Sequence, residues 1–212
     1  MEKQEMFEQA IQTRFKDHNK EDLLTMGIAI GTNQKTLKNL YIAYSKSEAK
    51  YENNPKRGVK IEVEFNFSED EVLIKRSERS LKFSREEFLV YLNLVMLCFG
   101  EIYPVGSVLE LDKNLLTKDF IESSGVREGE STVRVMVTDR FVPISEDNDE
   151  YFIDYLVRLP YGDQSTIFLN RVLIKGMVHD GLVNESEEEL VQEELRKELV
   201  ASGKRSVIFF NR

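Results

Sequence analysis

The strongest constraint on the fold is an uncharged apolar run, FLVYLNLVMLCFG, which extends from Phe88 to Gly100. Just before it, Ser84 and Glu87 stand at the S-x-x-E spacing of a capping box, which predicts that a helix begins there. The glycine at the end of the run can terminate this helix. Because the helix is apolar on most of its sides, it must be buried, and it is shorter than the roughly 20 residues that span a bilayer. The run therefore predicts a globular protein built around one central core helix.

The rest of the first half predicts further helices and one hairpin. Residues 1–16 carry apolar side chains at helical spacing, and Asn19 can cap a short helix over residues 20–26. Residues 33–53 suit a helix or a strand, and we expect the helix. Residues 59–77 alternate between apolar and polar side chains on either side of an SED turn, which predicts a hairpin with one solvated face.

After the central helix the patterns become strand-like. Polar turns separate most of these segments from one another. Strands are expected at residues 105–112, 131–144 and 151–159, and within 166–181 as a strand pair or one bent strand. A helix is expected over residues 184–203, with Ser186 and Glu189 as a second capping box, and a last strand over residues 205–210.

These segments together predict an α+β fold. N-terminal helices with a β-hairpin and a core helix are followed by an antiparallel sheet, open or barrel-like, with a C-terminal helix and strand. The change of pattern divides the chain into an α+β region, 1–100, and a mainly antiparallel β region with a C-terminal helix, 101–212. No flexible linker separates the two regions, so they can share one core.

The charge of the chain is distributed unevenly. Residues 1–100 hold 16 basic and 16 acidic side chains, whereas residues 101–212 hold 13 basic and 22 acidic ones, so the second half carries the whole net charge of −9. An acidic surface does not suit nucleic acid, which requires a basic face to displace its counterions. It permits a basic protein partner, and solubility alone also explains it.

The sequence predicts a cytoplasmic protein. Its opening residues, MEKQEMFEQAIQTRF, are charged and amphipathic, unlike the apolar leader of a secreted protein. The one cysteine, Cys98, lies inside the apolar run, so no intramolecular disulfide can form. A core position explains Cys98 better than a reactive thiol, which requires a basic and exposed setting.

No catalytic residue, cofactor or metal ligand is predicted. Gly27 and Gly31, with Lys35 behind them, lack the spacing of a phosphate-binding loop, and the ends of helices explain these glycines better. His18 and His179 have no partner at the spacing of metal ligands. The acidic SEDNDE segment lacks the central glycine and terminal glutamate of a calcium loop.

The densest group of residue types that anchor protein interfaces lies in the segment DEYFIDYLVRLPYGD. It contains Tyr151, Tyr155, Arg158 and Tyr161, and we predict a protein-binding surface there. Strand alternation places Tyr151 and Tyr155 on one face and Arg158 on the other. One of these faces has to belong to the core, so about half of the segment is expected to be structural.

Four segments of the second half follow in the order YPVGSVLEL, VRVMVTDRF, YFIDYLVRLPYGD and TIFLNRVLIKGMVHDG, and an acidic helix comes after them. With this order, residues 101–195 resemble a small uncharacterised family of Gram-positive bacterial proteins. The positions that carry the resemblance are Pro104, Gly106, Ser107, Val108, Leu111, Arg140, Asp154, Tyr155, Tyr161 and Gly176. The sequence departs from the family where Met177 replaces an aromatic residue. The resemblance implies a gene near type VII (ESX-like) secretion genes and supplies no catalytic residue.

These observations predict a non-enzymatic protein that binds another protein as an accessory, with a link to type VII secretion that the resemblance implies. Neither nucleic acid nor a membrane is an expected partner, and the oligomeric state is not predicted. One alternative is an immunity-type protein that neutralises a basic toxin, which the acidic second half would suit. The other is an enzyme of unrecognised type, which would need carboxylates brought together in a concave site.

Overall fold

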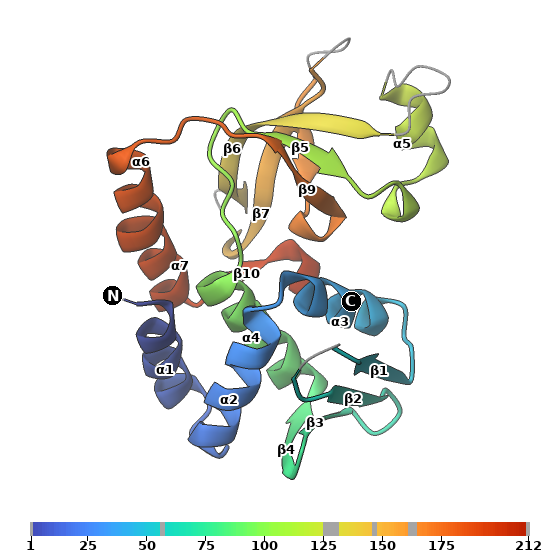
Figure 1. The fold of residues 1–212 in the computed structure, drawn as a ribbon, viewed down its shortest axis with the longest axis vertical. Coiled ribbons are helices and arrows are strands. Elements are labelled where there is room, and N and C mark those ends of the chain that lie inside the picture. The colour runs from blue at the N-terminus through green and yellow to red at the C-terminus, as the bar shows by residue number, and fades with distance from the viewer. Residues whose placement is uncertain (1, 56–57, 125–131, 146–147, 161–164, 211–212) are drawn as a thin grey trace. The chain divides into compact units, whose positions relative to one another are not determined.

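The chain forms two compact units in the computed structural model, which describes residues 2–55, 58–124, 132–145, 148–160 and 165–210. Unit 1 comprises Met1–Gly100 and Arg196–Gly203, and unit 2 comprises Glu101–Leu195 and Lys204–Phe210. The expected regions 1–100 and 101–212 differ from these units because part of the C-terminal helix belongs to unit 1. The helices and the two sheets, shown in Figure 1, confirm the predicted α+β class.

Unit 1 contains a four-stranded antiparallel sheet with one apolar face. Its strands, in sheet order, are β1 (Lys50–Asn53), β2 (Ile61–Asn66), β3 (Glu71–Arg76) and β4 (Arg79–Ser84). Alternation along β2 buries Ile61, Val63 and Phe65 and leaves the two glutamates between them at the surface. The predicted hairpin is confirmed as β2 and β3, and β4 extends it to a meander.

The predicted core helix is confirmed as α4 (Arg85–Phe99), the centre of unit 1. Its capping box is formed: the Glu87 N–H donates to Ser84 Oγ at 3.2 Å, and the Ser84 N–H donates to the Glu87 carboxylate at 2.8 Å. Nearly every side chain from Phe88 onward is buried, and the Tyr91 hydroxyl donates to the Leu23 carbonyl at 2.6 Å. An apolar helix without a charged face is stable only when other elements surround it in this way.

A buried arginine closes the C-terminal end of α4. Arg196 is the first residue of α7 (Arg196–Ser202), and its guanidinium donates to the carbonyls of Leu97, Cys98 and Gly100. The distances to Cys98 and Gly100 are 2.9 and 3.0 Å. The last carbonyls of a helix have no partner within the helix, so a cation there satisfies their hydrogen bonds and the negative end of the helix dipole.

Three further helices complete unit 1: α1 (Lys3–Arg14), α2 (Lys20–Gly31) and α3 (Gln34–Ser45). Asn19 caps α2 as predicted, accepting from the Asp22 N–H at 3.1 Å, but the helix continues beyond Met26. The prediction that Gly27 ends this helix is therefore wrong. A Cβ at Gly27 would overlap the ring of Phe7. The glycine therefore allows this ring of α1 to pack closely against the middle of α2.

Unit 2 contains a six-stranded sheet that is open at both sides. Its strands are β5 (Val108–Leu111), β6 (Val133–Ser145), β7 (Asn148–Arg158), β8 (Ile167–Leu169), β9 (Ile174–His179) and β10 (Arg205–Ser206). The order is β10-β7-β6-β5-β9, with β8 also beside β7, and all pairs are antiparallel except β10 with β7. Among the described residues, β9 and β10 do not pair with each other, so the barrel-like alternative is wrong.

One face of the unit 2 sheet forms the core. Its buried side chains include Leu109, Val135, Tyr155 and Leu169, and Phe120 of the short helix α5 (Lys118–Ser123) packs against them. The last strand is shorter than predicted, because β10 is followed by a single 3-10 turn.

The acidic C-terminal helix begins as α6 (Glu185–Glu189) and passes through a π-helical segment, Leu190–Leu195, before α7. The cap of α6 is Asn184, whose side chain accepts from the Glu187 N–H at 2.9 Å, so the predicted second capping box is wrong. The N-cap is the last residue with an extended backbone before the helix begins, and Asn184 occupies that position. No described helix is long and apolar enough to cross a membrane.

The turn in YPVGSV starts β5, as its proline and glycine predict. Gly106 has a φ of +86°, which favours glycine, and its N–H donates to the Val137 carbonyl at 2.8 Å. Gly181 lies against this turn, and its N–H donates to the buried Ser107 Oγ at 3.1 Å. The turn therefore joins the start of β5 to the segment that follows β9.

Candidate protein-binding surface

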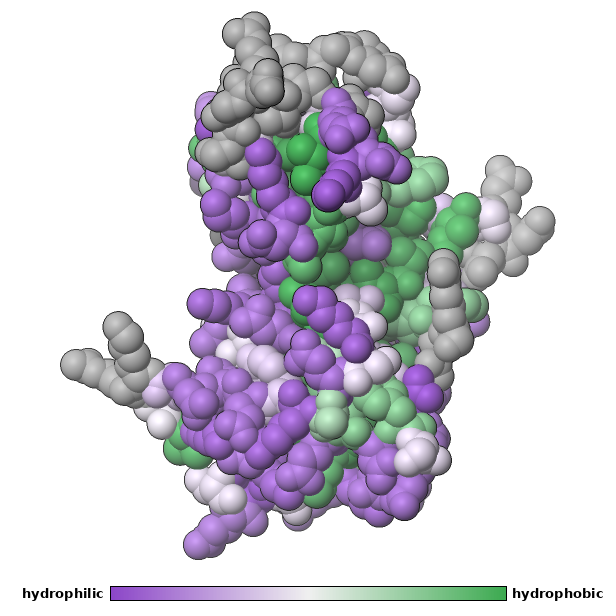
Figure 2. Space-filling view, turned by 90° about the vertical axis from the view of Figure 1, so that its right-hand side faces the viewer, coloured by the Kyte–Doolittle hydropathy of each residue, from purple (hydrophilic) through white to green (hydrophobic). Residues whose placement is uncertain are grey.

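Large apolar side chains reach the solvent mainly in unit 2. Among the described residues, unit 1 has one exposed large hydrophobic side chain, Val59. Those of unit 2 include Val105, Met136, Phe168, Met177, Leu182 and Val183. Figure 2 shows apolar side chains gathered over part of unit 2, whereas the visible surface of unit 1 is mostly hydrophilic. Contiguous apolar patches on a protein surface commonly mark binding sites.

A strip of apolar side chains crosses the face of the unit 2 sheet opposite the core, here called the outer face. Val108 of β5 lies directly opposite Met136 of β6, and Phe168 of β8 lies directly opposite Leu156 of β7. Met136 also pairs with Arg158, and Leu156 shares its face with Arg158 because residues two apart in a strand do so. The side chains of Phe168 and Met136 are 69% and 38% exposed. The strip therefore runs diagonally over four strands; Phe168 and Met136 are exposed, and Val108 and Leu156 are half-buried.

Basic side chains border this apolar strip. Arg134 and Arg158 are exposed on the outer face, and within the described part of the chain neither forms an ion pair. The nearby Glu110 is neutralised by Lys175, whose Nζ lies 2.6 Å from its carboxylate. This hydrogen bond and the charge of Glu110 raise the pKa of Lys175. Glu110 also lies directly opposite Arg134, and Asp139 lies directly opposite Leu156. Among the described residues, the border of the strip therefore has a small excess of positive charge, with Arg134, Arg158 and Lys175 against these two carboxylates, although the second half of the chain is acidic.

The four residues predicted as a binding surface lie in different environments. Arg158 lies on the outer face, and Tyr161 lies outside the described residues. Tyr155 is 0% exposed; its hydroxyl accepts from the Tyr103 N–H at 3.2 Å, and burial raises its pKa. Tyr151 is 7% exposed, with the Arg205 guanidinium 4.9 Å above its ring. The structure therefore places Arg158, but neither of the two described tyrosines, on an open surface.

The tyrosines are buried because both faces of the first half of β7 are covered. Residues 151–155 are all buried, including Phe152 and Asp154, which alternation placed on the opposite face from the tyrosines. Phe141 packs on Phe152 with ring centroids 5.4 Å apart, and β10 pairs along this part of the strand. The nearly continuous apolar run YFIDYLV is the sequence signal for such a doubly covered strand.

A polar cluster is enclosed beside these residues. Asp154 is 0% exposed and accepts three hydrogen bonds: from Arg171 Nε at 2.9 Å, from the Arg171 backbone N–H at 3.1 Å and from Ser206 Oγ at 2.9 Å. Burial is the largest single influence and acts to lower the pKa of Arg171, but the charge and hydrogen bond of Asp154, together with the nearby tyrosines, outweigh it, so the net direction is upward. Because solvent does not reach Asp154, the cluster suits a structural role better than catalysis.

Among the described residues, the other chemically reactive groups show no arrangement typical of a site. Burial raises the pKa of Cys98 to about 12, which keeps the thiol protonated and unreactive. His18 lies 3.4 Å from Glu87, and His179 is exposed on β9. In the part of the chain that the structure describes, no group of three or more His, Cys, Asp or Glu side chains could hold a metal ion.

Comparison with known proteins gives no relative, since no family model, curated protein or solved structure matches the chain. The resemblance of residues 101–195 to the Gram-positive family therefore stays a prediction.

Proposed function

We propose that the chain is a non-enzymatic, cytoplasmic accessory protein that binds another protein through the outer face of unit 2. The observation that carries this proposal is the open apolar strip of Val108, Met136, Leu156 and Phe168. Burying such a strip under a partner removes apolar surface from water, which is the main driving force of most protein association.

The residue types of the outer face also favour protein binding. Aromatic residues, methionine and arginine are enriched at the centres of protein interfaces, and here Phe168 and Met136 lie in the strip that Arg158 borders. Arginine can pair with a carboxylate through two parallel hydrogen bonds, which orients the partner. The face therefore offers both apolar area and directional contacts.

The proposed link to type VII secretion depends on the resemblance of residues 101–195. Several positions that carry it, such as Gly106, Ser107 and Asp154, have structural roles in unit 2. In this chain these positions help to form the sheet that presents the outer face. We propose that the partner is a protein handled by the secretion system.

The experiment compares partner recovery by matched surface variants. The purified chain is used as bait in a lysate of the organism that encodes it, together with Phe168→Asp in unit 2 and Leu73→Asp in unit 1. Leu73 is the control because it lies on the solvated face of the unit 1 sheet, between Glu64 and Lys82. We expect the wild type and Leu73→Asp to recover the same protein and Phe168→Asp to recover at least tenfold less, since a charge in an apolar contact has to be desolvated.

Two results would count against the proposal. Equal recovery by Phe168→Asp and the wild type would show that the outer face is not used. A partner released by salt but insensitive to Phe168→Asp would instead indicate a basic protein held by the acidic helix α6, as in the immunity alternative. Circular dichroism of both variants confirms that the fold is retained.

A further inference from the structure

The dimensions of the apolar strip indicate what can cover it. Side chains directly opposite on paired strands have Cβ atoms about 5 Å apart, and diagonal neighbours are about 7–8 Å apart. Val108 and Met136 form one direct pair, Leu156 and Phe168 form another, and a diagonal step joins the two pairs. The strip is therefore on the order of 17 Å long. Three turns of α-helix, about 11 residues at 1.5 Å each, have nearly the same length.

The strip lies on a sheet face rather than at a sheet edge, and this favours a helix over an extended segment. A strand laid across the face would bury its own N–H and C=O groups against side chains that cannot pair with them. A helix satisfies its backbone internally and presents only side chains to the sheet. The same packing of a helix on a sheet covers the inner face of unit 2, where Phe120 of α5 contacts the core.

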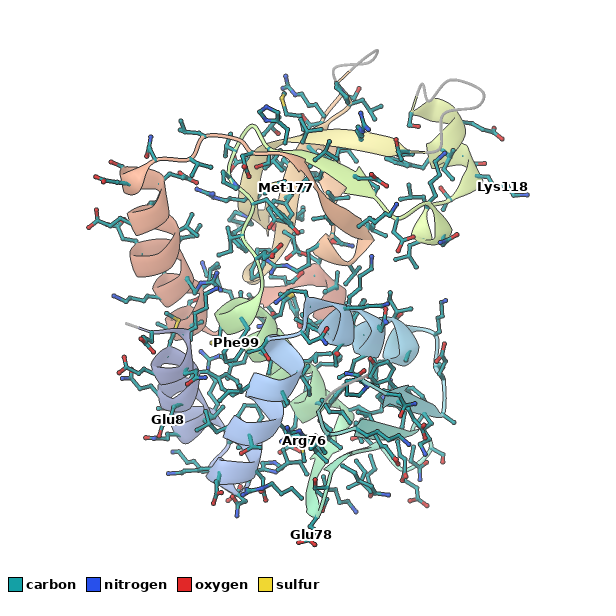
Figure 3. All side chains as sticks on the ribbon, in the orientation of Figure 1. Glu8, Arg76, Glu78, Phe99, Lys118 and Met177 are labelled. Carbon is teal, nitrogen blue, oxygen red and sulfur yellow. The ribbon has the colours of Figure 1, made fainter. Side chains whose placement is uncertain are left out.

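The charges that border the strip indicate which polar residues a partner would carry. Arg134 and Arg158 flank Met136 on neighbouring positions of the outer face. His179 lies opposite Val108 at the end of the strip on β9, and Figure 3 labels Met177 on the same strand. Of the acidic residues of the face, Glu110 pairs with Lys175, whereas Asp139 accepts only a neutral backbone hydrogen bond, from the Arg140 N–H at 2.8 Å, and keeps its charge opposite Leu156. The two arginines beside Met136 outnumber this one unpaired carboxylate. Carboxylates on a partner would complement this border, whereas lysines would be repelled.

We propose that the outer face binds an acidic amphipathic helix, with apolar residues at i, i+3 or i+4, and i+7 lying on the strip and glutamate or aspartate residues facing Arg134 and Arg158. This inference rests on the proposed function and specifies the partner segment. It differs from what the net charge of −9 indicates, because the local charge of the face is opposite to that of the chain as a whole.

The test uses peptide display, so that no natural partner has to be known. One library encodes 18-residue peptides with apolar residues at helical spacing and an equal choice of Glu or Lys at the flanking positions. A second library has the same composition with apolar and polar residues alternating as in a strand. Both are selected on the wild-type chain and counter-selected on Phe168→Asp. We expect peptides from the helical library, with Glu preferred over Lys by about tenfold.

The selected peptide is then synthesised, and its affinity is measured by fluorescence anisotropy. Arg134→Glu combined with Arg158→Glu should weaken binding by about tenfold or more, because both border charges are reversed. Lys75→Glu combined with Lys82→Glu changes the net charge equally on the sheet of unit 1 and should leave the affinity unchanged. A proline in the middle of the peptide should abolish binding, since it breaks the helix.

Each contrary result has a definite meaning. Selection of lysine-rich or strand-patterned peptides, or binding that survives the two arginine changes, overturns the acidic helix. If no peptide is selected while a natural partner still requires Phe168, the acidic helix is wrong and the proposed function stands. If neither a peptide nor a natural partner depends on Phe168, the proposed function fails as well.

Discussion

The two sheets of this protein distribute charge in opposite ways. The solvated face of the unit 1 sheet is a ladder of ion pairs, such as Lys75 with Glu64 at 2.8 Å and Lys60 with Glu52 at 2.9 Å. In unit 2 the corresponding face carries an apolar strip, while a complete ion pair, that of Asp154 in β7 with Arg171, is buried.

The two exposed sheet faces are suited to different roles. Charged cross-strand pairs on an exposed sheet contribute little stability but prevent sheets from associating, so the face of unit 1 is suited to remain in water. An apolar strip lacks this protection against association with other sheets. A buried ion pair carries the free-energy cost of removing both charges from water. Binding is the role that we propose for the outer face, and it would explain why the strip is not charged.

The largest expected effect comes from removing the buried carboxylate of unit 2. Asp154→Ala leaves the Arg171 charge without its partner, and we expect the free energy of unfolding to fall by about 3–5 kcal/mol. The matching change in unit 1, Glu64→Ala, removes a solvated pair and should cost less than about 1 kcal/mol. Urea denaturation measures both, and equal losses would contradict the contrast between the two sheets.

The second prediction concerns the packing of the segment after β9. A Cβ at Gly181 would overlap the backbone of Val105 and Ser107, which cannot move aside as a side chain can. Gly181→Ala should therefore lower the free energy of unfolding by about 1–3 kcal/mol. Gly176→Ala is the control, because a Cβ at Gly176 meets nothing within 4 Å and should change stability by less than about 0.5 kcal/mol. Thermal denaturation that ranks the two variants in the reverse order would refute the close approach.

A smaller effect on stability is expected when the apolar strip itself is made polar. Phe168→Ser and Met136→Ser alter exposed side chains, so the free energy of unfolding should change by less than about 0.5 kcal/mol each. Fluorescence of the dye ANS, which binds exposed apolar surface, should nevertheless fall, since these residues form much of the strip. Leu73→Ser in unit 1 should leave the fluorescence unchanged. A marked loss of stability in Phe168→Ser would mean that the residue is part of the core.

The smallest effect is the titration of the ion-pair ladder at the edge of unit 1. Hydrogen bonds from Lys50 and then Lys60 lower the pKa of Glu52 from 4.5 to about 2. The stabilisation is therefore present above pH 4.5 and is lost as the pH falls through about 2. NMR titration of the Glu52 carboxyl should show this midpoint, and Lys60→Ala should move it upward. A midpoint near 4.5 in the wild type would show that the lysines are too mobile in solution to lower the pKa of Glu52.

Much of the fold follows from local patterns in the sequence. The capping box of Ser84 and Glu87 with the apolar run after it predicts α4, and strict alternation predicts β2 and β3. These signals succeed because a helix or a hairpin is specified by residues a few positions apart. The turn of YPVGSV is predicted for the same reason, since the positive φ of Gly106 is a local requirement.

Tertiary structure decided which surfaces are covered. Alternation in β7 separated Tyr155 from Arg158, but the burial of Asp154 on the second face depends on Arg171 and Ser206, which are distant in sequence. The cap of α4 by Arg196, 96 residues beyond Gly100, has no local signal at all. The sequence by itself determined that each strand has two faces. Only the packing of distant elements determined which face stays open, because burial depends on what the rest of the chain places against it.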